Sequence, residues 1–157
     1  MKIVVTGGRR YGIPPEWTGR PSPFVWRQVG GETVEEENPA YIAACMKAGA
    51  ENATLRRVLN NWLGDHAGYD LVLAHGGASG ADTLAGRWAE ENEIPVTVFE
   101  ADWKGHGKSA GPVRNRRMLE EFRPDFVIAF PGGAGTENCV RFAHQRGILV
   151  VRVRGER

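Results

Sequence analysis

Four glycine-rich segments each follow a short apolar run, and they hold most of the residues that could do chemistry. They read TGGRRY from Thr6, HGGASGAD from His75, ADWKGHGKSAGPVRN from Ala101 and PGGAGTEN from Pro131. Glycine lets a backbone approach a ligand closely and point its N–H groups at it. A lone glycine pair forms a simple tight turn as often as it forms a binding loop. The prediction of a ligand site therefore depends on the four loops together.

The charge around these loops indicates an anionic ligand, with phosphate as the leading candidate. Helices that begin after the loops would direct the positive ends of their dipoles at one place. Arg9, Lys104, Lys108 and Arg114 fall in the loops or at predicted helix starts. Arginine can hold a phosphate through two parallel hydrogen bonds, so for Arg114, just past SAGP, we place binding ahead of surface solvation.

Two carboxylates, Asp82 and Glu137, come early in predicted helices. The simpler interpretation is a favourable interaction with the helix N-terminus, worth about 0.3–1 kcal/mol. The functional interpretation is hydrogen bonding to ribose hydroxyls, or stabilisation of positive charge that develops at an anomeric carbon. His75 and His106 could assist, but a lone loop histidine is more often polar surface.

Length and composition fit one soluble domain. The chain has 157 residues, 41% of them hydrophobic and 25% charged, and a formal net charge of +1. This near-neutral charge balance indicates neither a nucleic-acid partner nor a membrane partner. No apolar run approaches the roughly 18 residues of a membrane span, and the N-terminus shows no signal-peptide pattern, so we expect a cytoplasmic protein.

Nothing in the sequence points to a metal or a cofactor. Cys45 and Cys139 lie far apart without metal-ligand spacing, and we expect both to be reduced thiols. A Walker GxxxxGK[ST] segment is absent, which argues against a P-loop NTPase, and so is GxGxxG, which weakens a conventional NAD site.

Five continuous apolar runs predict the strands that position the loops. They are Lys2–Thr6, Leu71–His75, Val96–Phe99, Phe126–Phe130 and Ile148–Val153. Unbroken apolar runs are typical of parallel strands that are covered on both faces. Between them lie helical stripes, among them Leu84, Ala85, Trp88 and Ala89, and Gly147 is placed to end the last helix. The prediction is an α/β Rossmann-like three-layer domain with a mostly parallel sheet of about five strands.

One long segment, from Gly12 to about Pro39, has no clear period. Long loops inside compact domains are usually functional or disordered. Its aromatic residues, Trp17, Phe24 and Trp26, argue against plain disorder because aromatic side chains seek burial. Three interpretations of this segment stay open: a lid over the site, a surface for a partner, and a long loop that packs on the rest of the domain.

The ordered motifs resemble those of a known group. PGGAGT after an apolar strand resembles the PGGxGT signature of the SLOG superfamily, which includes the LOG cytokinin-activating phosphoribohydrolases, the lysine-decarboxylase-like proteins and the Smf/DprA proteins. The full set of motifs is most similar to the YspA-type branch of bacterial and phage proteins. Relative to that pattern, one domain spans residues 1–157 with an insertion at about residues 12–51.

The resemblance implies phosphate binding by the loop that holds Gly132, Gly133, Gly135 and Thr136. LOG enzymes hydrolyse the N-glycosidic bond of nucleoside 5′-monophosphates with an arginine and a glutamate as catalytic pair. RNRRM supplies Arg114 at the arginine's place, but the family's two glutamates fall on Asn138 and Cys139, whereas Glu137 sits one residue early. A shift of one residue turns a side chain by about 100° around a helix, which puts LOG-type hydrolysis in doubt.

The leading hypothesis is therefore a site for a nucleoside phosphate or a nucleotide-derived ligand, possible N-glycosidase activity included, with Arg114 and Glu137 as candidate catalytic residues. The predicted binding residues are Gly7, Gly8, Arg9, Gly76, Gly77, Ser79, Gly80, Asp82, Lys108, Arg114, Asn115, Gly132, Gly133, Gly135 and Thr136.

Two alternatives stay open. One is a non-catalytic nucleotide sensor in a signalling, conflict or phage-related system. The other is DprA-like single-stranded nucleic-acid binding, for which RNRR and Trp103 are suggestive and which is least favoured because the chain is near-neutral. The resemblance also implies a homo-oligomer.

Overall fold

A five-stranded sheet lies at the centre of the molecule, in a computed structural model that describes residues 1–15, 19 and 21–155. All neighbouring strands are parallel, and their order is β5-β4-β1-β6-β7. The strands are β1 (Lys2–Thr6), β4 (Val72–His75), β5 (Val96–Val98), β6 (Phe126–Ala129) and β7 (Leu149–Arg152). The predicted Rossmann-like α/β fold is confirmed, and each predicted strand is found with its ends shifted by at most one residue.

The central strand β1 explains why the sheet has a core on both faces. Val4 pairs in register with Ala74 of β4 and Val127 of β6. Ile3, Val4 and Val5 are all fully buried. Successive side chains of a strand point to opposite faces, so this β-branched run serves two hydrophobic cores at once.

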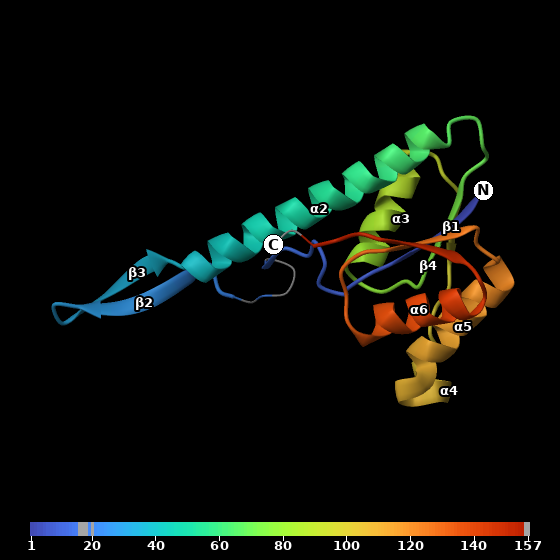
Figure 1. The fold of residues 1–157 in the computed structure, drawn as a ribbon. Helices are drawn as coiled ribbons and strands as arrows, with labels where there is room; N and C mark the ends of the chain where they lie inside the picture. Colours follow the sequence, from blue (N-terminus) through green and yellow to red (C-terminus); the bar gives the residue numbers. More distant parts are fainter. Residues whose placement is uncertain (16–18, 20, 156–157) are drawn as a thin grey trace.

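One face of the sheet is covered by α2 (Pro39–Asp65) and α3 (Ala81–Glu91), which lie above the strands in Figure 1. Leu55 and Leu59 of α2 and Trp88 of α3 are fully buried in this first core. The predicted stripe of α3 is confirmed. Its burial anchors the helix whose first turn carries Asp82.

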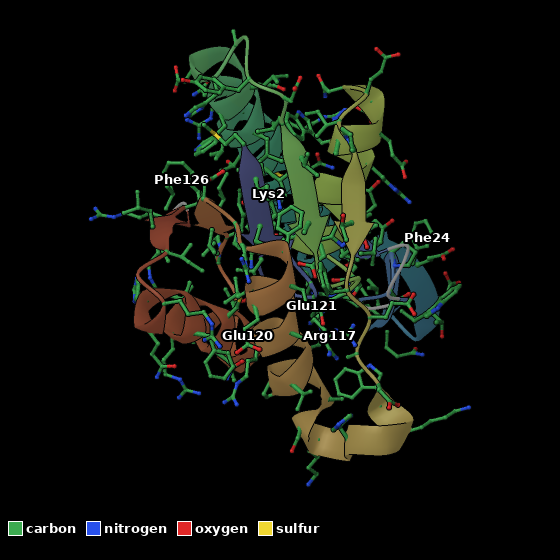
Figure 2. The ribbon with its side chains drawn as sticks, turned by 90° about the vertical axis from the view of Figure 1, so that its right-hand side faces the viewer. Lys2, Phe24, Arg117, Glu120, Glu121 and Phe126 are labelled. Carbon is green, nitrogen blue, oxygen red and sulfur yellow. The ribbon has the colours of Figure 1, made fainter. Side chains whose placement is uncertain are left out.

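The opposite face is covered by α5 (Ala110–Phe122) and α6 (Ala134–Gln145). Met118, Leu119 and Phe142 pack in this second core. In Figure 2, α5 lies in front of the strands and carries the charged side chains of Arg117, Glu120 and Glu121. The short α4 (Trp103–His106) and the 3-10 turn η1 (Gly107–Ser109) precede α5. At the far end, α6 stops two residues before Gly147, whose φ of 68° is the left-handed value expected of a helix-ending glycine.

The strand order reverses between β1 and β6. The chain builds the sheet outwards from β1 to β4 and β5, then crosses back to add β6 and β7 on the other side. Ligands of open α/β sheets bind outside the carboxyl ends of the strands at such a reversal. The loops after β1 and β6 touch there, where the Gly8 N–H donates to the Pro131 carbonyl at 2.9 Å.

The segment without a clear period contains a β-hairpin. Strands β2 (Phe24–Val29) and β3 (Glu32–Glu37) pair antiparallel, with Val29 opposite Glu32 across a two-residue turn. Gly30 and Gly31 both have positive φ, 61° and 91°, as a tight hairpin turn of this length requires. The paired glycines after a β-branched residue were the sequence signal for this turn, and the aperiodic charges around them obscured it.

The hairpin and the first half of α2 project from the body of the molecule (Figure 1). Every residue of β2 and β3 is exposed except Val25, which is half-buried. At 27 residues, α2 is about 40 Å long, and its buried residues begin only at Ala48. Within the expected insertion at about residues 12–51, positions 16–18 and 20 lie outside the described residues, and Trp17 is one of them.

No helix in the described part of the chain has the length and apolarity needed to cross a membrane. Cys45 and Cys139 are both free.

Candidate functional site

Three cavities meet at the carboxyl edge of the sheet, and Arg9 lines all of them. We name each after one lining residue: the Asp82 cavity, the Gly77 cavity and the Lys108 cavity. They lie where the loops after β1, β4, β5 and β6 converge. The four glycine-rich segments of the sequence therefore gather at one place, as their positions after parallel strands predict.

The Asp82 cavity has a volume of about 330 Å³ and lies over the reversal point of the sheet. Most of the predicted binding residues line it, namely Gly7, Gly8, Arg9, Asp82, Arg114, Asn115, Gly133, Gly135 and Thr136. Thr6, Ala78, Gly111 and Ala134 complete the lining. Thr136 and Asn115 are buried, so this cavity has a fixed polar wall.

Asp82 is held in the first turn of α3 and is only 4% exposed. Its Oδ2 accepts the N–H groups of Gly76 at 3.0 Å and Ala78 at 3.2 Å. Burial raises the pKa of this carboxyl to about 6, although the Ala78 hydrogen bond and the charge of Arg114 oppose the rise. No hydrogen bond among the described residues reaches Oδ1, so one oxygen of a buried carboxyl is left to the cavity.

Arg114, in the first half of α5, connects three elements at the site. Its Nη1 donates to the Gly76 carbonyl after β4 and to the Phe99 carbonyl after β5, the latter at 3.2 Å. Its Nε donates to Asn115 Oδ1 at 2.9 Å. The Asn115 amide in turn donates to the Gly135 carbonyl at 3.1 Å. This network fixes the start of α6 against α5.

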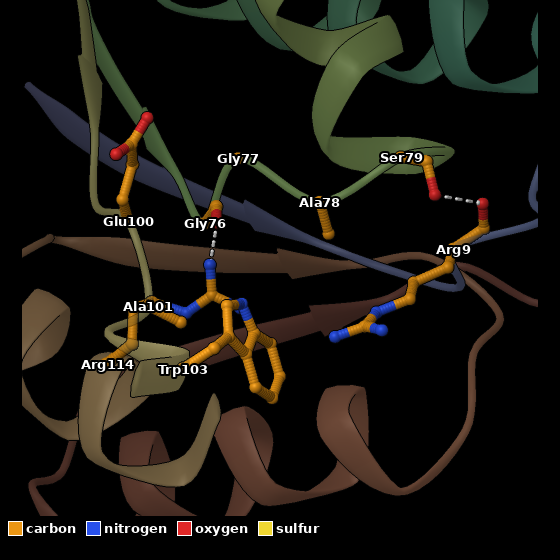
Figure 3. A pocket seen from close by; sticks show the side chains of 9 residues that line it. All are labelled: Arg9, Gly76, Gly77, Ala78, Ser79, Glu100, Ala101, Trp103 and Arg114. Atoms are coloured by element: carbon orange, nitrogen blue, oxygen red, sulfur yellow. Dashed lines mark hydrogen bonds between the residues drawn. The ribbon is translucent and has the colours of Figure 1, made fainter. Parts of the chain in front are cut away.

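The Gly77 cavity, of about 380 Å³, lies beside the first one and is shown in Figure 3. Its lining includes the predicted residues Gly76, Gly77 and Ser79. Trp103 forms a further wall, and its ring lies 5.3 Å from the Arg9 guanidinium carbon. The Ser79 hydroxyl donates to the Arg9 carbonyl at 2.9 Å, which ties the loops after β1 and β4 together.

The Lys108 cavity, of about 730 Å³, adjoins both of the others. It shares Gly111, Ala134 and Gly135 with the Asp82 cavity and Trp103 with the Gly77 cavity. The predicted residue Lys108 lines it, together with Arg9 and Arg141. Its wall is therefore rich in positive charge.

Glu137 lies in the wall of the Lys108 cavity, but its carboxylate is engaged elsewhere. Its two oxygens each accept one hydrogen bond at 2.8 Å from Arg152 of β7. This contact lowers the pKa of Glu137. Glu137 does not line the Asp82 cavity, where Arg114 lies. The two residues expected as a catalytic pair thus face different spaces.

The predicted glycines divide into two groups. At Gly76 a Cβ atom would overlap the Arg114 guanidinium, and at Gly80 it would overlap the Gly8 carbonyl. At Gly132 it would overlap Thr136. Gly133 and Gly135, in contrast, have no atom within 4 Å of such a Cβ. The first group lets the loops approach each other, and the second leaves space for a ligand.

Two buried groups near the site serve the fold. His75 Nδ1 accepts the Gly77 N–H at 3.0 Å, and burial, with a smaller contribution from Arg114, lowers the pKa of this imidazole. Burial raises the pKa of the Cys139 thiol to about 12, which keeps it unreactive. Among the described residues, no three His, Cys, Asp or Glu side chains gather as a metal site would require.

Sequence reasoning missed Arg141 as a site residue and considered Trp103 only for stacking in the nucleic-acid alternative. Ala134, Asn138 and Arg141 recur at helical spacing along one face of α6, and all three line the Lys108 cavity. That spacing was the available signal for Arg141. The contact of Trp103 with Arg9 could not be predicted, because α4 brings the two side chains together only in the folded chain.

Comparison with known proteins shows which family this chain belongs to. The family model of the YspA, cpYpsA-related SLOG family matches residues 41–106. The Gene 61 protein of Mycobacterium phage D29 is 43% identical over 90 residues, which cover 53% of this chain and 71% of that protein. A UDP-GlcNAc 2-epimerase from Neisseria meningitidis, solved with UDP-GlcNAc bound, superposes with a TM-score of 0.47 and 14% identity over 98% of this chain but 32% of its own. On the sequence match to the phage protein and the family model, this chain belongs to the YspA, cpYpsA-related SLOG family.

Proposed function

We propose that the protein binds a nucleotide across the three cavities at the carboxyl edge of the sheet. The observation that carries the proposal is the sharing of Arg9 by all three, because it places three chemically different parts next to one another, within reach of one ligand. A buried carboxylate, an exposed aromatic ring and a group of cations suit the ribose, the base and the phosphate of one molecule.

The ribose fits the Asp82 cavity. The free Oδ1 of Asp82 can accept a ribose hydroxyl, and its raised pKa does not prevent this because a neutral carboxyl still accepts. A phosphate does not suit this carboxylate. It fits the first turn of α6, whose N–H groups have no acceptor within the helix and whose N-cap, Gly133, supplies no side-chain cap.

The base fits the Gly77 cavity. Trp103 is 52% exposed and presents a ring to that cavity, and Arg9 lies over the same ring. Stacking of a base on an aromatic side chain is worth about 1–3 kcal/mol and tolerates different bases. The site would therefore bind nucleotides more tightly than ribose 5-phosphate alone.

The test is a panel of nucleoside phosphates in a thermal-shift assay, with ribose 5-phosphate as the fragment that lacks a base. A ligand at 100 times its Kd stabilises the folded protein by about 2.7 kcal/mol, which raises the melting temperature by several degrees. Mass spectrometry of the supernatant from denatured protein would identify a nucleotide that co-purifies. If no nucleotide shifts the melting temperature, the proposal fails.

Hydrolysis of the N-glycosidic bond is a finer proposal for the same site. Asp82 shares its cavity with Arg114, whereas Glu137 does not, so Asp82 is the carboxylate that could stabilise positive charge at the anomeric carbon. Water would add to that carbon while its bond to the base breaks, giving free base and ribose 5-phosphate. Chromatographic detection of released base tests this hydrolysis. The Asp82→Asn variant should release no base, whereas the Glu137→Gln variant should still release it.

Binding without hydrolysis would favour the nucleotide sensor over the enzyme. A gel shift with single-stranded DNA at low salt tests the nucleic-acid alternative, for which Trp103 is the suggestive residue. The homo-oligomer implied by the family resemblance stays a prediction, and sedimentation equilibrium tests it.

A further inference from the structure

We propose that the ligand of this site carries a pyrophosphate, with its second phosphate in the Lys108 cavity. This inference rests on the proposed function and adds the number of phosphates to it. It follows from the juxtaposition of a large cavity, a group of cations that form no ion pair among the described residues and the open first turn of α6.

The cations come from three different segments of the chain. Arg9 follows β1, Lys108 lies in η1 and Arg141 lies on α6, and all three line the Lys108 cavity. None of the three has a carboxylate at ion-pair distance within the described residues, whereas Arg152 is paired with Glu137. Like charges that share a cavity repel one another, so a bound anion would relieve this repulsion.

The one carboxylate in this lining does not cancel the field. Both oxygens of Glu137 are bound by Arg152, and that ion pair is neutral as a unit. The remaining polar group on the α6 wall is Asn138, whose Oδ1 already accepts the Asn115 amide at 3.2 Å. A phosphate in the Lys108 cavity would therefore meet net positive charge.

The direction of the second phosphate follows from the first. The Lys108 and Asp82 cavities share Ala134 and Gly135, so a phosphate on the first turn of α6 touches both. A group bonded to that phosphate can extend towards the Asp82 carboxylate or towards Lys108 and Arg141. Coulomb's law favours the second direction for another phosphate.

The volumes agree with this assignment. The Asp82 cavity, at about 330 Å³, holds little more than a sugar and its phosphate, while the Lys108 cavity, at about 730 Å³, has a volume well within the roughly 300–1,000 Å³ usual for ligand sites. A nucleoside monophosphate would leave the larger space and its cations unused. Both a terminal diphosphate and a pyrophosphate linked to a further sugar have the chemistry that fits.

Calorimetric titration of the full chain with AMP, ADP, ADP-ribose, GMP and GDP tests the inference. At least one diphosphate is expected to bind tenfold or more tightly than its monophosphate. ADP-ribose that binds at least as tightly as ADP would identify a linked pyrophosphate, and weaker binding than ADP a terminal one. Equal affinities for AMP and ADP and for GMP and GDP would overturn the inference and leave the proposed function standing. If no nucleotide binds, both the inference and the proposed function fail.

The charge-deletion variant Lys108→Ala/Arg141→Ala connects the effect to the cavity. Both side chains are exposed, so the variant is expected to fold with an unchanged melting temperature. It should lower the ratio of diphosphate to monophosphate affinity below threefold. The matched control Lys47→Ala/Arg57→Ala removes the same two charge types from positions that line none of the three cavities, and it should leave the ratio unchanged. A ratio that falls equally in both variants would overturn the assignment to this cavity.

Discussion

Asp82 is the residue at which the demands of the fold and of the ligand conflict most clearly. Burial removes most of the water from a carboxyl that receives two backbone N–H groups. The charged form is therefore disfavoured in the folded protein, and its pKa is raised from 3.8 to about 6. Retaining such a group weakens the fold, and residues with this property are often part of a functional site.

The first prediction concerns the pH dependence of stability. Between pH 4 and pH 6 the folded state holds the Asp82 proton more tightly than the unfolded state, so this group's contribution to stability is lost as pH rises through about 6. The rise from 3.8 to about 6 corresponds to a loss of roughly 3 kcal/mol in the free energy of unfolding once the carboxyl is ionised. Asp82→Asn should therefore gain stability relative to wild type at pH 7.5 but not at pH 4, as measured by urea unfolding. Comparing the two proteins cancels the opposite contribution of His75, and a pH-independent difference would contradict the assignment.

The second prediction separates glycines that serve the fold from one that serves the ligand. Gly80 has φ of 79° and no room for a Cβ atom, so Gly80→Ala should destabilise the protein by about 2 kcal/mol or more. Gly135 lies in the first turn of α6 with open space around it, so Gly135→Ala should leave the melting temperature unchanged or slightly higher. Its methyl group would occupy the proposed phosphate position, and nucleotide affinity should fall at least tenfold. Unchanged nucleotide affinity in Gly135→Ala would show that the phosphate does not bind at this position.

At the scale of elements, the network around Arg114 shows how α5 positions the site. Its guanidinium joins the ends of β4 and β5 through the Gly76 and Phe99 carbonyls and orients Asn115 towards α6. A helix that packs only through its apolar stripe could slide along the sheet, whereas these hydrogen bonds fix its first turns. Arg114 is thus a structural as well as a candidate ligand-binding residue.

The third prediction tests this double role. Arg114→Lys keeps the positive charge but loses the Nε hydrogen bond to Asn115 and one of the two carbonyl contacts. At about 1 kcal/mol for each hydrogen bond, the free energy of unfolding should fall by about 2 kcal/mol, with weaker nucleotide binding as well. Arg116→Lys on the same helix is the control, since a lysine can keep the contact of Arg116 with the Phe142 ring. Equal stability of the two variants would show that the charge of Arg114 suffices.

At the scale of the whole molecule, the sequence predicted the body and missed the projecting hairpin. The five strands and the stripes of α3, α5 and α6 have strong apolar periods that burial then enforces, as Trp88 and Met118 illustrate. The hairpin buries almost nothing, so its sequence carries no such constraint, and only the Gly30–Gly31 turn marked it. The direction of the Glu137 side chain was equally beyond prediction, because its partner Arg152 lies on β7, fifteen residues away.

The last prediction uses the tryptophans to compare the hairpin with the site. Trp26 is 66% exposed on β2, on the projecting hairpin, while Trp103 lines two of the three cavities. If the base stacks on Trp103, a nucleotide should change the tryptophan fluorescence of the wild-type protein, and Trp103→Phe should remove most of that change. Trp26→Phe should retain it, because the hairpin lines none of these cavities. A ligand-dependent signal that disappears with Trp26 instead would mean that the hairpin moves on binding, as the lid and sensor hypotheses require, and would assign nucleotide sensing to the whole molecule.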